Sequence, residues 1–177
     1  RAQVVDADQT FDHLGVAGAI AEGSRTTAET PAYAIGYLPV ALSMLASGDL
    51  SGAVKTYDHL EASGVVGARL ARLGRIDLAM YRGRYNEAER LIAAATESDA
   101  ANAPFAAQLL VADAQVALAL GQKPRAADAA VKAAAASTNE STLFPAAMVL
   151  IDAGRVADAR KIAQTLDRLL QAQTEQQ

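Results

Sequence analysis

Residues 79–95, AMYRGRYNEAERLIAAA, predict the end of one helix, a tight turn and the beginning of a second helix. Gly83 is placed at the turn because glycine adopts the left-handed backbone conformation that commonly ends helices without a steric cost. Five residues later stands Ala88, whose small side chain allows the second helix to cross the first closely. The stretch therefore predicts a pair of helices joined by a short turn.

The same glycine and alanine recur along the chain. Four turn glycines are separated by 35, 38 and 33 residues, and an alanine stands five residues after each of them. A regular spacing of this length indicates a repeated helix pair. The glycines and their alanines are Gly48 and Ala53, Gly83 and Ala88, Gly121 and Ala126, and Gly154 and Ala159.

The spacing divides the chain into segments. We expect about four helix pairs within residues 32–170, because apolar residues recur there at helical spacing between the turn glycines. Asp49 is a candidate N-cap. One or two short helices are expected before residue 23, and the polar runs 23–31 and 137–142 predict loops. The expected segments are an N-terminal helical and loop segment at 1–31, helix pairs at 32–63, 66–97, 104–136 and 143–170, and a frayed tail at 171–177.

Composition favours an all-α protein and excludes several classes of function. Apolar residues make up 51% of the chain, but only 5% are aromatic, and much of the remainder is alanine, the best helix former. The absence of cysteine excludes disulfides, thiolate zinc sites and cysteine nucleophiles. A net charge of −4 with interleaved acids and bases argues against nucleic-acid binding. The longest apolar stretch, 103–120, is interrupted by polar residues, so we expect no membrane span.

The repeated frame resembles the tetratricopeptide repeat family over roughly residues 34–170. In that family a small residue on the first helix, a glycine turn and a small residue on the second helix recur in each pair. More narrowly, YRGRYNEAERLI (81–92) and TLFPAAMVLIDAGRVADA (142–159) look like the alanine-rich repeats that follow the kinase domain in bacterial eukaryotic-type serine/threonine kinases. The residues that fit the frame are Ala41, Met44, Gly48, Asp49, Leu50, Ala53 and Tyr57; Ala79, Gly83, Arg84, Tyr85, Ala88 and Ile92; Ala114, Ala117, Gly121, Ala126 and Ala130; and Ala147, Leu150, Gly154, Val156 and Ala159.

The resemblance implies an α-solenoid, a right-handed superhelix of helix pairs, and a non-enzymatic protein-protein interaction module. It also implies that the chain is the regulatory or sensor region of a larger bacterial signalling protein. The sequence does not determine whether this region is cytoplasmic or extracytoplasmic. Position 1 is Arg rather than Met, so we expect a trimmed or processed chain. No kinase motif is present, and the resemblance therefore implies no catalytic residue, cofactor or metal.

In the family, the first helices of the pairs line a concave surface that binds a peptide or protein. Met80, Tyr81, Phe144 and Met148 are the expected apolar anchors, because methionine and aromatic side chains adapt to a partner's shape. The alternative is that these positions pack in the core, or are covered by residues 1–30 or by further repeats. The candidate groove is Leu73, Asp77, Met80, Tyr81, Gln108, Gln115, Phe144 and Met148, with Leu38, Leu42, Leu45, Val111, Leu118 and Asp152 near it.

Three other patterns each have a plain and a functional interpretation. Arg69, Arg72 and Arg75 are spaced by three residues, which suits either an anion site or, as we favour, a solvated face paired with acids of neighbouring helices. The acids Asp6, Asp8 and Asp12 suggest a calcium loop, but Phe11 and Ala17 stand where that loop needs glycine and glutamate. The two histidines, His13 and His59, lie far apart and suggest no metal site.

A structural role is the alternative function. The last helix would then carry an exposed apolar face within 162–170, on which further repeats or a second copy would stack, making the chain a spacer or oligomerisation unit. An enzyme is disfavoured because the sequence offers no convergent set of catalytic residues.

Overall fold

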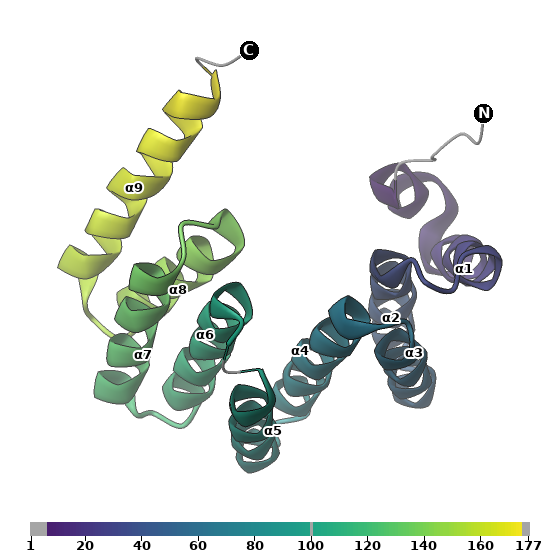
Figure 1. Cartoon of the computed structure of the whole chain (residues 1–177), viewed down its shortest axis with the longest axis horizontal. Coiled ribbons are helices and arrows are strands. Elements are labelled where there is room, and N and C mark those ends of the chain that lie inside the picture. The colour runs from purple at the N-terminus through teal and green to yellow at the C-terminus, as the bar shows by residue number, and fades with distance from the viewer. Residues whose placement is uncertain (1–6, 100, 175–177) are drawn as a thin grey trace. The chain divides into compact units, whose positions relative to one another are not determined.

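The computed structural model describes residues 7–99 and 101–174, and within them the side chains other than those of 7–14, 16, 17 and 173. These residues form helices and no strand, which confirms the all-α prediction (Figure 1). The helices are α1 (Ala7–Glu29), the 3-10 helix η1 (Ala34–Gly36), α2 (Tyr37–Ala46), α3 (Leu50–Ala62), α4 (Val65–Tyr81), α5 (Tyr85–Ser98), α6 (Ala103–Ala119), α7 (Lys123–Ala136), α8 (Glu140–Asp152) and α9 (Val156–Thr174).

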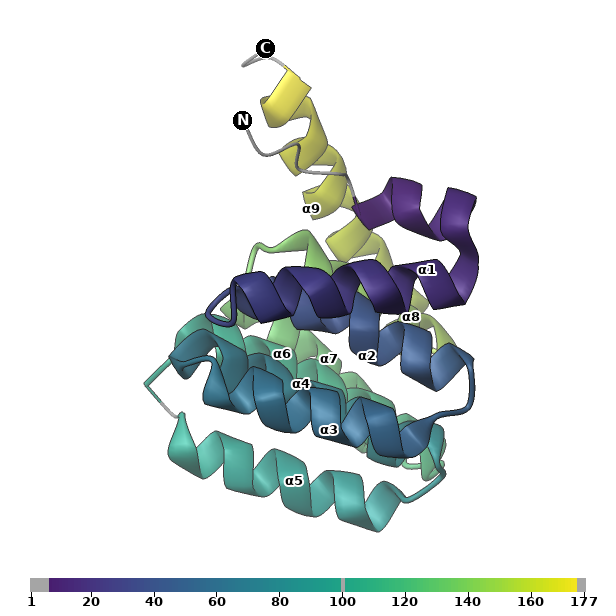
Figure 2. The ribbon, with the colours of Figure 1, turned by 90° about the vertical axis from the view of Figure 1, so that its right-hand side faces the viewer.

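The chain divides into two compact units, Arg1–Arg75 and Ile76–Gln177, and the division falls within α4. In the first unit α2 packs between α1 and α3 (Figure 2). Its core includes Val40 and Ala41 of α2 and Tyr57 and Leu60 of α3, all buried. Arg75 of α4 forms ion pairs with two acids of α3, which links α4 to that helix.

The loop predicted at 23–31 is wrong, because α1 continues to Glu29. Gly15 interrupts α1 with a φ of 64° and a ψ of −177°, so the segment is two helical pieces, and Figure 2 shows the break. The sequence at 23–29 is rich in serine and threonine, which are weak helix formers. Thr26 and Thr27 nevertheless satisfy their hydroxyls within the helix, each donating to a carbonyl one turn earlier at 3.0 Å.

Packing and charge explain why this part of α1 stays helical. Gly23 lies so close to α2 that an added Cβ would be 2.3 Å from Cγ2 of Val40, and only glycine permits that approach. Arg25 pairs with Glu22 and Glu29, one turn away in each direction, on the exposed side. Tertiary contact with α2 therefore overrides the weak local propensity.

The loop predicted at 137–142 is shorter than expected. Only 137–139 separate α7 from α8, because Asn139 caps α8 by accepting the Ser141 N–H at 2.9 Å. Asp49, the predicted N-cap of α3, likewise accepts the Gly52 N–H at 2.8 Å.

The four predicted turns share one geometry. Each turn glycine has a positive φ, between 67° and 85°. The residue after each glycine donates its N–H to the carbonyl five residues earlier at 2.7 to 2.8 Å, as in a Schellman motif. The alanines five residues after the glycines are all buried. The bonds are Asp49 to Met44, Arg84 to Ala79, Gln122 to Ala117 and Arg155 to Leu150.

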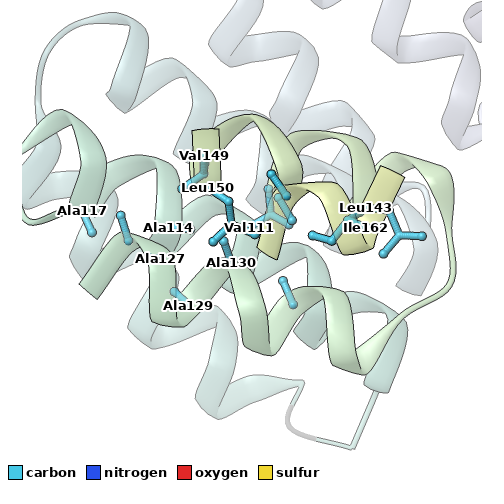
Figure 3. Close-up of a cluster of buried hydrophobic side chains, with 14 residues drawn as sticks. Val111, Ala114, Ala117, Ala127, Ala129, Ala130, Leu143, Val149, Leu150 and Ile162 are labelled. Carbon is cyan, nitrogen blue, oxygen red and sulfur yellow. The ribbon is translucent and has the colours of Figure 1, made fainter. Parts of the chain in front are cut away.

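The core of the second unit lies among α6, α7, α8 and α9 (Figure 3). It combines a few branched side chains with many alanines, so the helix axes approach closely. Leu143 and Leu150 of α8 and Ile162 of α9 meet Val111 of α6 in this cluster. Val111 was expected near the concave surface. That expectation is wrong, because the side chain is 7% exposed.

Candidate functional site

An exposed apolar stripe runs along α8. Phe144, Met148 and Ile151 are 60%, 45% and 48% exposed. Their spacing of four and three residues places them on one side of the helix. Leu143 and Leu150 on the opposite side are buried in the core. We call Phe144, Met148 and Ile151 the α8 stripe.

The stripe is unusual because α8 is apolar on both sides. A surface helix normally carries polar residues on the side that faces water. The exposed arc of α8 instead combines the stripe with Glu140, Ser141 and Asp152, which lie toward the two ends of the helix. Exposed apolar side chains that are contiguous on one helix are a common mark of an interaction site.

The other predicted site residues of the second unit lie on α4 and α6. On α4, Asp77 is exposed, Met80 is half-buried and Tyr81 is 74% exposed. Gln108 and Gln115 are half-buried on α6, which packs directly against α8. The structure therefore brings two amides and the α8 stripe onto neighbouring helices.

Equivalent positions before the turn glycines share their exposure. Six residues before the glycine stand Leu42, Asp77, Gln115 and Met148, none of which is buried. Leu38 and Leu45 are half-buried and belong, like the half-buried Leu73, to the first unit, so they are not part of this site. Ile151 was missed from the sequence, although its position three residues after Met148 was the signal that could have found it.

The three arginines that the sequence spaces along α4 all interact with other groups of the protein. Arg75 pairs with Asp58 at 2.8 Å and with Glu61 at 2.6 Å. Arg69 and Arg72 also have interaction partners. The two ion pairs of Arg75 agree with a face paired with acids of a neighbouring helix rather than with an anion site.

The described residues contain neither a cluster of metal ligands nor a helix suited to span a membrane. His59 is exposed in the last turn of α3. The side chains of Asp6, Asp8, Asp12 and His13 lie outside the described residues. Within 7–99 and 101–174, no three potential metal ligands come together. No helix in the same ranges has the length and apolarity needed to cross a membrane, as expected from the sequence.

A hollow elsewhere in the second unit is lined by no residue of the α8 stripe. It has a volume of about 420 Å³ and opens at the turn between α4 and α5, beside Leu120 at the end of α6. Arg84, which lines it, pairs with Glu87 at 3.4 Å. None of the predicted site residues contributes to this hollow.

Asp77 should make stability depend on pH. The protein around this exposed residue removes part of the water that hydrates its carboxylate, which raises its pKa from 3.8 to about 6. The folded state thus binds more protons than the unfolded state between these values. With its carboxyl protonated, Asp77 imposes no desolvation penalty on the folded state, so the stability is fully present below pH 3.8. This stability is lost as the pH rises through about 6 and the carboxyl of the folded protein ionises.

Asp77→Asn is therefore expected to stabilise the protein at pH 7 and to have no such effect at pH 3.5. Because Asp77 reaches solvent, screening limits the gain to at most about 1 kcal/mol. Urea denaturation at the two pH values would measure it. Tyr81→Phe on the same helix removes no carboxyl and should change stability equally at both. An equal gain at both pH values for Asp77→Asn would contradict the prediction.

No family model matches the chain, and no curated protein matches it. The candidate site is therefore defined by the geometry of the second unit: the exposed α8 stripe, the amides of neighbouring α6 and the exposed end of α4.

Proposed function

We propose that the chain is a non-enzymatic protein-interaction module that binds a peptide or protein on the exposed side of its first helices. The observation that carries the proposal is the α8 stripe, in which three large apolar side chains face solvent on a helix whose other side is fully packed. Burying such side chains against a partner would contribute about 25 cal/mol for each Å² of apolar surface.

The chemistry of the stripe suits a helical or extended partner. Phe144 and Met148 supply an aromatic ring and a flexible thioether, the side-chain types that serve as anchors at interfaces. Gln108 and Gln115 on the adjacent helix offer amide donors and acceptors that would orient a partner's backbone. We further propose, from the tetratricopeptide-like frame, that the helix pairs form a solenoid and that the module is the regulatory or sensor region of a larger bacterial signalling protein.

A peptide selection would test the proposed binding face. Peptides selected from a random library against the native chain are expected to bind the Phe144→Ser/Met148→Ser variant at least about tenfold more weakly, because two anchors are lost. The matched control is Val131→Ser/Val156→Ser, which changes apolar residues that are 38% and 48% exposed on α7 and α9. Circular dichroism would establish that each variant is folded. Selected peptides that bind all three proteins equally would overturn the proposal.

The alternative function is a spacer or oligomerisation unit. Within 162–170 of α9, Ile162 is buried, Leu166 and Leu169 pack partly against the core, and Leu170 is 56% exposed. The C-terminal part of α9 extends beyond α8 (Figure 1). Self-association that Leu170→Ser abolishes, measured by sedimentation velocity, would favour this alternative over peptide binding.

A further inference from the structure

Charge is distributed unevenly between the first and second helices of the second unit. Neither α6 nor α8 contains a lysine or arginine, and α4 contains none from Ile76 to its end. The basic residues of this unit lie instead on the second helices and in the turns between helices. They are Arg82, Arg84, Arg90, Lys123, Arg125, Lys132, Arg155, Arg160, Lys161 and Arg168.

The acids of the first helices have two different environments. Asp113 on α6 is already neutralised by Arg125 of α7, at 2.5 Å. In contrast, Asp77, Glu140 and Asp152 take part in none of the ion pairs found among the described residues. The first helices therefore present acids without a paired cation together with the α8 stripe. Among them, Glu140 lies in the first turn of α8, where the partial positive charge of the helix end favours a carboxylate.

The position of Asp152 makes it costly within the isolated chain. It is the last residue of α8, where the partial negative charge of the helix end disfavours a carboxylate. Asp77 stands near the end of α4 and has an unfavourable ionised form, as its raised pKa shows. A cation brought by a partner would relieve both penalties, whereas a partner's carboxylate would increase them.

We propose that the partner of this face is a basic amphipathic peptide segment, in which apolar side chains cover the α8 stripe and flanking lysines or arginines approach Asp77, Glu140 and Asp152. This inference rests on the proposed function and specifies its partner. It follows from the joint occurrence of exposed apolar side chains and unpaired acids on α8, which carries no basic residue, together with the unpaired Asp77 on the part of α4 that follows Arg75. An acidic segment would meet like charge across the same surface.

Three synthetic helical probes would test the inference on the whole chain by fluorescence anisotropy. The first has leucines at spacings of four and three residues flanked by lysines, the second replaces every lysine by glutamate, and the third keeps the lysines but replaces every leucine by glutamine. We expect the first probe to bind at least about tenfold more tightly than either of the others, and its affinity to fall as salt screens the charges.

Carboxamide variants locate the charge effect. Asp77→Asn/Asp152→Asn is expected to weaken the first probe by about three- to tenfold, the range for two partly exposed ion pairs. Asp128→Asn/Asp167→Asn, on α7 and α9, changes the net charge by the same amount and should leave its affinity within about twofold. Equal weakening in the two variants would show attraction to overall charge and would overturn the inference.

The remaining outcomes separate this inference from the proposed function. If the glutamate probe binds as tightly as the lysine probe and both depend on Phe144 and Met148, the binding face stands and the basic partner is wrong. If no probe binds while library-selected peptides do, the same conclusion holds. If the chain dimerises in sedimentation velocity and Phe144→Ser/Met148→Ser abolishes the dimer, a second copy covers the face and the inference is overturned.

Discussion

Leu150→Ala is expected to lower the free energy of unfolding by about 2–5 kcal/mol. Leu150 is fully buried and lies in the cluster that joins α8 to its neighbours. Its truncation removes apolar contacts and leaves a cavity among helices that alanines already hold close together, so the surroundings have little freedom to collapse into the space. Urea denaturation followed by circular dichroism would measure the loss.

The adjacent residue provides the matched control. Ile151 is 48% exposed on the α8 stripe, and Ile151→Ala should change the free energy of unfolding by less than about 1 kcal/mol. The contrast tests which side of α8 is packed, because the two residues are neighbours in sequence and similar in size. A cost for Ile151→Ala equal to that for Leu150→Ala would mean that the stripe is covered, and would remove the basis of the proposed binding face.

The turns were predictable because their cause is local. A positive φ after a helix strongly favours glycine, and a close crossing of two helices requires a small side chain. Gly121 therefore predicts the turn, and Ala126 predicts the buried helix crossing. Asp49 is equally local, since its side chain bonds an N–H only three residues away. Local features of this kind are sufficient to place the helix pairs from the sequence.

The errors arose where distant contacts decide the conformation. The helix at 23–29 depends on α2, since Gly23 fits against Val40, and no local pattern records that contact. The same limit applies to the site. On α8 both sides carry apolar residues, so periodicity alone does not tell which of Phe144 and Leu143 faces solvent. The distance of each residue from the turn glycine Gly154 makes that distinction. On α6 that register placed Val111 near the surface, but the packed neighbours of α6 bury it.

Gly74 shows how a residue that weakens a prediction can be required by packing. Glycine within a helix costs about 1 kcal/mol relative to alanine, yet Gly74 lies inside α4 and is buried. The ring of Tyr57, on α3, lies across it. A Cβ at position 74 would be 2.3 Å from Cε1 and 2.6 Å from Cζ of that ring. Because Tyr57 is itself only 3% exposed, the ring has little room to move away.

Overpacking at this site costs up to about 3 kcal/mol, and the better helix propensity of alanine offsets about 1 kcal/mol of that cost. Gly74→Ala is therefore expected to destabilise the protein by about 1–2 kcal/mol. Tyr57→Leu removes Cε1 and Cζ, the two atoms in closest conflict. In that background the sign should reverse, and Gly74→Ala should stabilise by about 0.5–1 kcal/mol. Urea denaturation of the four proteins in this double-mutant cycle would measure the coupling. If Gly74→Ala has the same effect with either residue at position 57, helix propensity alone governs position 74 and the contact between α3 and α4 does not explain its glycine.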